Sequence, residues 1–237
     1  MVTLETLRIE LYVDSAALED FRRFAPLPYI GGFTTNPSLM RKAGVTDYLA
    51  YVKEALALAQ GKPVSFEVIA DDFHEMRRQA LLLASKGDNV FVKIPIMNTR
   101  REETCGLIRE LCAEGVKVNV TALFLPDQVS RVAEVLRPGL PSLVSVFAGR
   151  IADTGVDPVP LMKECRRILK VPGSKLLWAS QREILNIIQA QEVGCEVITV
   201  QPSTLDKLKG LGTDLLEASH QTVVIFARDA AASGFNI

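Results

Sequence analysis

The sequence predicts a (β/α)8 barrel that forms a single domain over residues 1–237. Short β-rich segments alternate with segments of helical period along the whole chain, which is the pattern of a parallel sheet with helical crossovers. There are eight such units, the number that closes a barrel, and no linker or low-complexity tract divides them. A doubly wound open sheet is the alternative, because periodicity does not show closure. It is disfavoured because no Gly-rich phosphate loop follows the first strand.

The expected strands are apolar runs bounded by polar or turn residues. In chain order they are Glu10 to Asp14, Gly32 to Thr35, Val64 to Ala70, Val90 to Ile96, Lys117 to Phe124, Leu143 to Phe147, Lys175 to Ala179 and Glu196 to Val200. Helices are expected over Tyr48 to Gln60, Glu102 to Glu114 and Arg182 to Val193, each followed by a glycine suited to the C′ position. Pro126 and Pro158 stand where a first helical turn would begin. A C-terminal helical segment is expected at about residues 212–235.

Composition and charge argue against several kinds of partner. Lys and Arg number 27 against 28 Asp and Glu, with the signs interspersed, so neither nucleic acid nor a membrane is an expected partner. The first residues lack the basic and apolar regions of a secretion signal, and no apolar stretch could span a bilayer, so we expect a cytoplasmic protein. The four cysteines and two histidines have no ligand spacing, so no metal is expected.

Lys93 lies within the run Asn89-Val-Phe-Val-Lys-Ile-Pro-Ile96, which predicts a buried strand. An ordinary solvent-facing lysine is not expected there, so Lys93 should face an interior cavity. Apolar walls favour the neutral amine of a lysine, and a neutral amine can attack a carbonyl to form a Schiff base. The alternative is a structural lysine that is paired with a carboxylate such as that of Glu67.

Other polar residues lie at or near the ends of the expected strands: Asp14, Asn36, Glu67, Thr121, Ser145, Arg150, Ser180 and Arg182. Active sites of barrels form where the C-terminal ends of the strands converge, so these side chains are expected to meet around Lys93. Taken alone, each has a structural alternative, such as a cap of a βα turn for Asp14 or Asn36. Their combination favours a common site.

Ordered motifs along the chain identify a family. They are Leu-Tyr-Val-Asp-Ser (11–15), Thr-Thr-Asn-Pro-Ser (34–38), Ser-Phe-Glu-Val (65–68), Val-Lys-Ile-Pro (92–95), Asn-Val-Thr-Ala-Leu-Phe (119–124), Ser-Val-Phe-Ala-Gly-Arg-Ile-Ala-Asp (145–153) and Ala-Ser-Gln-Arg (179–182). Together they resemble the transaldolase family, and within it the compact branch that also contains fructose-6-phosphate aldolases. The resemblance extends to Phe226-Ala-Arg-Asp-Ala230 and Gly234-Phe235.

This resemblance implies class I aldol chemistry without a metal or other cofactor. Lys93 would attack the ketone of a ketose phosphate, and the resulting iminium would accept electrons when the C3–C4 bond breaks. Asp14 would take the proton of the C4 hydroxyl. Glu67, with a water held by Thr121, would move protons while the carbinolamine forms and dehydrates.

The resemblance also implies how the substrate is held. Asn36 and Ser145 would bind the hydroxyls of the dihydroxyacetone unit. The distal phosphate would be bound by Arg150, Ser180 and Arg182, for which surface pairing of the arginines is the alternative. The family further implies a ring-like homo-oligomer that is built partly through the C-terminal helix.

Two residues favour transfer over simple cleavage, because aldolases of the compact branch carry glutamine and tyrosine where this chain has Glu67 and Phe147. The expected activity is transfer of dihydroxyacetone between sugar phosphates, a reaction of the pentose phosphate pathway. The rivals are an aldolase that releases dihydroxyacetone and a catalytically silent barrel that binds sugar phosphates. Gln181, where phenylalanine is usual, and the large Trp178 are departures that bear on the donor and acceptor.

Overall fold

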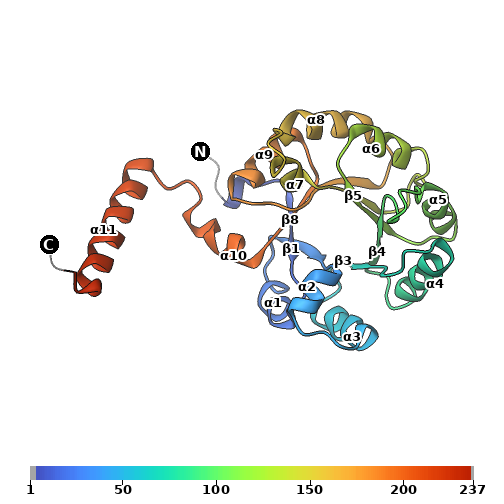
Figure 1. The fold of residues 1–237 in the computed structure, drawn as a ribbon, viewed down its shortest axis with the longest axis horizontal. Coiled ribbons are helices and arrows are strands. Elements are labelled where there is room, and N and C mark those ends of the chain that lie inside the picture. Colours follow the sequence, from blue (N-terminus) through green and yellow to red (C-terminus); the bar gives the residue numbers. More distant parts are fainter. Residues whose placement is uncertain (1–3, 236–237) are drawn as a thin grey trace.

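The computed structural model describes residues 4–235 and shows a closed barrel of eight parallel strands (Figure 1). The strands are β1 (Glu10–Asp14), β2 (Ile30–Thr34), β3 (Val64–Glu67), β4 (Val90–Pro95), β5 (Val118–Leu123), β6 (Ser142–Val146), β7 (Ser174–Trp178) and β8 (Val197–Val200). Each strand pairs with the next, and β1 pairs with β8 from Glu10 opposite Val197 to Val13 opposite Val200. This last pairing closes the sheet, so the (β/α)8 prediction is confirmed and the open sheet is excluded.

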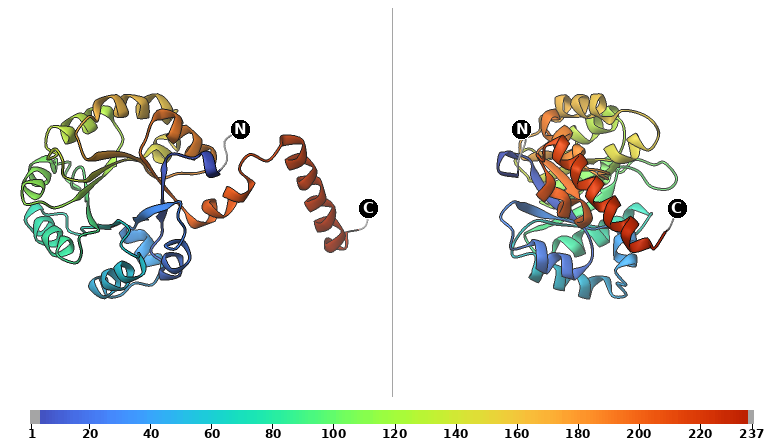
Figure 2. Two further views of the ribbon diagram at one scale, coloured as in Figure 1. Left: turned by 180° about the vertical axis from the view of Figure 1, so that it is seen from behind. Right: turned by 90° about the vertical axis from the view of Figure 1, so that its left-hand side faces the viewer.

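Helices surround the strands in an outer layer, except for the last helix, which stands apart (Figures 1 and 2). They are α1 (Leu18–Phe24), α2 (Pro37–Lys42), α3 (Tyr48–Leu58), α4 (Phe73–Ala84), α5 (Cys105–Ala113), α6 (Pro126–Ala133), α7 (Ala148–Ala152), α8 (Pro158–Ile168), α9 (Leu185–Val193), α10 (Pro202–Leu205) and α11 (Leu215–Ser233), with 3-10 turns at η1 (Leu4–Thr6) and η2 (Asp206–Gly210). Pro126 and Pro158 open α6 and α8, as predicted. Gly194, with a φ of 86°, ends α9 in the left-handed conformation that glycine tolerates.

Side chains shift some element boundaries from their predicted positions. Helix α5 begins three residues after the expected Glu102, because the side-chain oxygen of Asn98 accepts a hydrogen bond from the Glu102 backbone. Helix α9 begins three residues after Arg182, because the side chain of Asn186 accepts from the backbone of that arginine. Such local bonds compete with helical ones and are hard to foresee from periodicity.

Strand β3 ends before the predicted Ala70 for a similar reason. The side-chain oxygen of Gln79 accepts hydrogen bonds from the backbone N–H groups of Ile69 and Ala70. These two residues therefore leave the sheet and form the loop that leads to α4.

The apolar residues form two layers. The larger one lies between the strands and the helices, and Trp178 is fully buried in it. The smaller one lies inside the barrel and consists of Tyr12, Phe91, Leu143, Leu177, Ala179 and Val197. Most of this layer lies below the C-terminal mouth of the barrel, and Leu177 and Ala179 reach the mouth itself, so the polar side chains there stand beside and above apolar ones.

Helix α11 leaves the barrel and stands clear of it (Figures 1 and 2). None of its described residues is buried, and large apolar side chains along it are exposed, among them Leu215, Val223 and Phe226. Its length and exposure distinguish it from the helices that cover the barrel. Within the described residues, no helix combines the length and apolar character needed to cross a bilayer.

Candidate active site

A cavity of about 480 Å³ opens at the C-terminal mouth of the barrel. Every residue that the sequence predicts for the site lines it: Asp14, Asn36, Glu67, Lys93, Thr121, Ser145, Phe147, Arg150, Ser180 and Arg182. Residues up to about 170 positions apart in the chain therefore meet, because the strands converge there. The same cavity is lined by Thr34, Asn119, Thr199 and Gln201, which the sequence reasoning missed as site residues.

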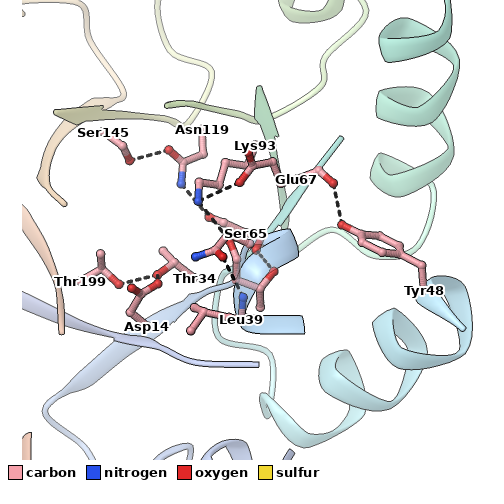
Figure 3. Close-up of polar contacts among 12 residues, drawn as sticks. Asp14, Thr34, Leu39, Tyr48, Ser65, Glu67, Lys93, Asn119, Ser145 and Thr199 are labelled. Carbon is pink, nitrogen blue, oxygen red and sulfur yellow. Dashed lines mark hydrogen bonds and ion pairs between the residues drawn. The ribbon is translucent and has the colours of Figure 1, made fainter. Parts of the chain in front are cut away.

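Lys93 lies in β4 and points into the cavity (Figure 3). Only 8% of its side chain is exposed, and its Nζ is 3.1 Å from Glu67 Oε2. The same nitrogen donates a hydrogen bond to the backbone carbonyl of Thr35 at 3.1 Å. Glu67 stands opposite Lys93 in the register of β3 with β4, which places the carboxylate beside the amine. The lysine is therefore held by a carboxylate and a carbonyl inside an otherwise apolar strand.

Asp14 ends β1 and shares the cavity with Lys93. Its pKa is raised above the ordinary value, chiefly because burial disfavours the charged carboxylate. The positive charge of Lys93 and a 2.8 Å hydrogen bond from the Thr34 hydroxyl oppose this rise, while the negative charge of Glu67 adds to it. The charges of Lys93 and Glu67 therefore act on the same buried carboxyl group, in opposite directions.

Asn119 connects the polar groups of β3, β5 and β6 (Figure 3). Its side-chain nitrogen donates to Ser65 Oγ at 2.9 Å, and its side-chain oxygen accepts from Ser145 Oγ at 2.6 Å. The alternation of a strand could have revealed it, because Asn119 lies two residues before the predicted Thr121 and so faces the same side.

Thr121 has a buried hydroxyl without a hydrogen-bond partner among the described residues. The next residue, Ala122, has a φ of 61°, and the register of β5 with β6 shifts between Val120 and Leu123. A bulge of this kind re-aims side chains and is common beside active sites. The hydroxyl is thus available to a ligand in the cavity.

Asn36 has both of the roles considered for it. Its side-chain oxygen caps α2 by accepting from the backbone N–H of Leu39 at 2.9 Å. The residue also lines the cavity. The cap engages the oxygen, and the amide nitrogen can donate to a ligand.

Two arginines form the rim of the cavity. The guanidinium of Arg150 lies over the ring of Phe147, 5.3 Å from the ring centroid. Arg182 pairs with Asp153 through two hydrogen bonds, one of them 3.2 Å from Nε to Oδ1, and these bonds hold the pKa of Asp153 below its ordinary value. Arg182 therefore has the surface pairing considered as its alternative, and it remains a lining residue of the cavity.

The loop after β7 is locked against α7, which fixes the two arginines relative to each other. A Cβ atom added at Gly149 would lie 1.5 Å from the carbonyl oxygen of Ser180, so only glycine fits. Ser180 itself has a φ of 62°, a conformation that costs free energy in residues other than glycine. This close contact holds the segments bearing Arg150 and Arg182 side by side.

The two departures from the family pattern do not line the cavity. Trp178 packs in the layer between strands and helices. Gln181 is buried, and its side-chain nitrogen donates to Thr204 Oγ1 in α10 at 3.1 Å, so it ties the loop after β7 to that helix. Neither side chain is therefore in a position to change the shape of the cavity directly.

The chain matches the family described as Transaldolase/Fructose-6-phosphate aldolase over residues 11–235. A probable transaldolase of Methanococcus maripaludis is 34% identical over 202 residues, which cover 84% of this chain and 89% of the relative. Another of Nitrosopumilus maritimus is 35% identical over 203 residues, which cover 84% and 87%. One of Brucella ovis is 32% identical over 218 residues, which cover 88% and 96%.

Solved structures share the fold at low identity. The dihydrodipicolinate synthase of Rhodopseudomonas palustris has a TM-score of 0.59 and 15% identity, and the match covers 97% of this chain and 81% of that chain. The tryptophan synthase A-subunit of Pyrococcus furiosus has a TM-score of 0.59 and 12% identity, covering 86% and 91%. At such identities the likeness concerns the barrel alone.

Proposed function

Because the chain belongs to the transaldolase/fructose-6-phosphate aldolase family, we propose that it is a class I transaldolase acting through a Schiff base on Lys93. It transfers a dihydroxyacetone unit from a ketose phosphate, such as fructose 6-phosphate or sedoheptulose 7-phosphate, to an aldose phosphate in the cytoplasm. One observation carries the proposal. A buried amine lies 3.1 Å from the carboxylate of Glu67, in a cavity that also contains Asp14 and has two arginines at its rim.

The first steps form the Schiff base. Lys93 Nζ adds to the ketone carbon of the donor, and the carbinolamine loses water to give an iminium. Glu67 is within hydrogen-bond distance of Nζ and can take and return the protons that these steps require. The hydroxyl of Thr121, which has no hydrogen-bond partner within residues 4–235, supports a role in orienting the water that leaves and later returns.

Cleavage of the C3–C4 bond then requires a base at the C4 hydroxyl, and Asp14 takes this role. Its pKa is raised by burial, and a carboxyl group with a raised pKa is a better base than an ordinary one, which suits a group that accepts and returns a proton. The iminium on Lys93 accepts the electrons of the broken bond and becomes an enamine. Asn36 and Ser145, which line the same cavity, hold the hydroxyls of the bound three-carbon unit.

The distal phosphate binds between Arg150, Ser180 and Arg182. Guanidinium groups suit this role because their planar fork matches the oxygens of an anion. Arg182 is held by Asp153 in the absence of substrate, and the phosphate would share or replace this pairing. All of the proposed steps use side chains, so the reaction requires neither a metal nor an organic cofactor.

Transfer is favoured over release by Phe147, whose ring lines the cavity. After cleavage, the enamine either attacks a new aldehyde or is protonated and hydrolysed. A phenyl ring cannot donate a hydrogen bond to the water needed for hydrolysis, so the enamine persists until an acceptor arrives.

We also propose that the chain forms a homo-oligomer in which α11 contacts a neighbouring copy. None of the described residues of α11 is buried, and its exposed apolar side chains include Leu216, Val224 and Phe226. Large exposed apolar surfaces of this kind are characteristic of interfaces. Sedimentation of the full chain and of a chain ending at Gly212 should show a loss of the oligomer in the shorter one.

Acceptor dependence tests the proposed activity. Fructose 6-phosphate alone should yield little dihydroxyacetone, whereas added erythrose 4-phosphate should give sedoheptulose 7-phosphate rapidly. Rapid release of dihydroxyacetone without an acceptor would identify an aldolase instead. Binding of the sugar phosphates without turnover under either condition would identify a silent barrel.

A further inference from the structure

Two threonine hydroxyls stand in series beside Asp14 (Figure 3). Strand β1 lies between β2 and β8, so Thr34 at the end of β2 and Thr199 in β8 flank the strand that carries Asp14. Thr34 Oγ1 donates to Asp14 Oδ1 at 2.8 Å, and it is also hydrogen-bonded to Thr199 Oγ1. Both threonines are buried and line the cavity. Neither hydroxyl takes part in the proton transfers described for Glu67 and Asp14.

The chemistry of these groups fixes the direction of both hydrogen bonds. An ionised carboxylate only accepts, so the single hydroxyl proton of Thr34 is committed to Asp14. In the bond between the two threonines, Thr34 must then accept and Thr199 must donate. Hydroxyls in series polarise one another, so the bond from Thr199 strengthens the bond from Thr34 to the carboxylate.

The series also makes the two oxygens of Asp14 unequal. Oδ1 accepts the bond from Thr34, whereas Oδ2 accepts no hydrogen bond from the described residues. Oδ2 is therefore the oxygen available to a substrate hydroxyl. When Oδ2 is protonated, Oδ1 is still an acceptor, so the bond from Thr34 persists in both protonation states.

We propose that Thr199 and Thr34 form a hydroxyl relay that positions Asp14 and keeps it ionised as the base for the C4 hydroxyl of the substrate. This inference rests on the proposed function. In the step concerned, the hydroxyl proton passes to Asp14 Oδ2, and the electrons of the O–H bond form the C4 carbonyl. The electrons of the C3–C4 bond move to the iminium on Lys93, which becomes the enamine. Both threonines are positioning residues, because they act through Asp14.

The surroundings of Asp14 explain why such support is needed. Burial and the charge of Glu67 both raise the pKa of Asp14, so both oppose its ionisation. Lys93 from β4 and Glu67 from β3 are the charged groups that face it, since β2 and β8 carry no ionisable side chain. The hydrogen bond from Thr34 lowers the pKa, so its loss should raise the pH at which Asp14 becomes ionised.

The pH profile of kcat/KM for transfer from fructose 6-phosphate to erythrose 4-phosphate tests the relay. Protonated Asp14 is inactive as a base, so it contributes the acidic limb of the profile. Thr34→Val should move this limb to higher pH by about 1 unit, and Thr199→Val by about half as much. The acidic limb of the double variant should lie no further from that of the wild type than the limb of Thr34→Val does. Thr199 acts on Asp14 only through the hydroxyl of Thr34, so it has no effect once that hydroxyl is removed.

Conservative variants and a matched control distinguish the relay from general damage. Thr34→Ser and Thr199→Ser keep the hydroxyls and should restore the wild-type limb. Thr104→Val removes another buried hydroxyl, which donates to the carbonyl of Pro95 at 2.6 Å outside the cavity, and should leave the limb in place. Where valine prevents folding, alanine at the same position provides a second deletion of the hydroxyl.

Borohydride trapping separates failure of the relay from failure of the proposed function. Wild-type protein with fructose 6-phosphate should carry a three-carbon adduct on Lys93, and the absence of any adduct would overturn both proposals. In Thr34→Val the Schiff base should form while cleavage is slowed, so the share of the six-carbon phosphate adduct should rise. The relay alone would be overturned if the wild type forms the adduct but the acidic limb of Thr34→Val does not move. The same holds if the shifts of the two single variants add up in the double variant, or if the share of the six-carbon adduct in Thr34→Val is unchanged.

Discussion

Two layers of the barrel interior are built from the same strands but differ in character. In four strands an apolar residue precedes a polar one by two positions: Tyr12 and Asp14, Phe91 and Lys93, Leu143 and Ser145, and Val197 and Thr199. Residues two apart in a strand face the same side and are about 7 Å apart along it. A distance of two residues along these strands therefore separates a packed apolar layer from a cavity with charged groups.

This difference separates stability from chemistry. A buried ion pair such as Lys93 with Glu67 contributes little net stability, because desolvation offsets the attraction. The apolar layer below stabilises the barrel because it buries apolar surface. Substitutions in the upper layer should therefore lower activity, and substitutions in the lower layer should lower stability.

The largest effect is expected at Lys93. Lys93→Met removes the amine that forms the Schiff base and should lower turnover by at least about three orders of magnitude. Circular dichroism should show an intact fold. Lys117→Met is the matched control at the opposite end of the barrel, where the lysine donates to the carbonyl of Asp88, and it should change turnover by no more than about twofold.

A smaller effect is expected at the rim. Arg182→Ala should raise KM for phosphorylated donors by about 10- to 100-fold, since a hydrogen bond to a charged group contributes about 1.5–3 kcal/mol. Reactions with unphosphorylated dihydroxyacetone should change much less. Arg166→Ala, which removes an ion pair with Glu196 outside the cavity, is the control. Equal losses for both kinds of donor would assign Arg182 a structural role through Asp153.

The balance between transfer and release should respond to Phe147. Phe147→Tyr supplies a hydroxyl near the enamine and should increase acceptor-independent release of dihydroxyacetone, while slowing transfer by less than Arg182→Ala does. The ratio of dihydroxyacetone to sedoheptulose 7-phosphate measures the change. An unchanged ratio would show that the ring does not control access of water.

The smallest effect on chemistry is expected in the lower layer. Leu143→Ala leaves a cavity beneath Ser145 and should reduce the free energy of unfolding by about 2–5 kcal/mol, as measured by urea titration. The turnover of the protein that remains folded should stay close to that of the wild type. Ser145→Ala should mainly weaken substrate binding, with a smaller loss of stability of about 1 kcal/mol from its hydrogen bond to Asn119. Equal losses of activity in Leu143→Ala and Ser145→Ala would contradict the division of the interior into a layer for stability and a layer for chemistry.

The sequence was sufficient for the barrel and for ten of the residues that line its mouth, although it missed others such as Asn119 and Thr199. The strands are continuous apolar runs, and charged residues within or at the end of such runs are expected to face the mouth, as Asp14 and Lys93 do. Alternation alone would have added Asn119 and Thr199, which lie in phase with Thr121 and Val197.

Other features depend on contacts between distant segments and could not be predicted. The bond between Thr34 and Thr199 requires β1 to lie between β2 and β8, which only barrel closure establishes. The pairing of Arg182 with Asp153 depends on the locked loop after β7. The side chain of Gln181 likewise points toward α10 because of a contact between distant segments. It therefore lies outside the cavity, although its neighbours Ser180 and Arg182 line it.

Mass analysis of Lys93 after borohydride reduction tests the central claim most directly. With fructose 6-phosphate as donor, the peptide that contains Lys93 should gain the mass of a reduced dihydroxyacetone adduct, and the peptide that contains Lys117 should not. Erythrose 4-phosphate added before borohydride should reduce the amount of adduct, because the enamine is consumed by transfer. An unmodified Lys93 peptide under conditions of measurable turnover would contradict the Schiff-base mechanism.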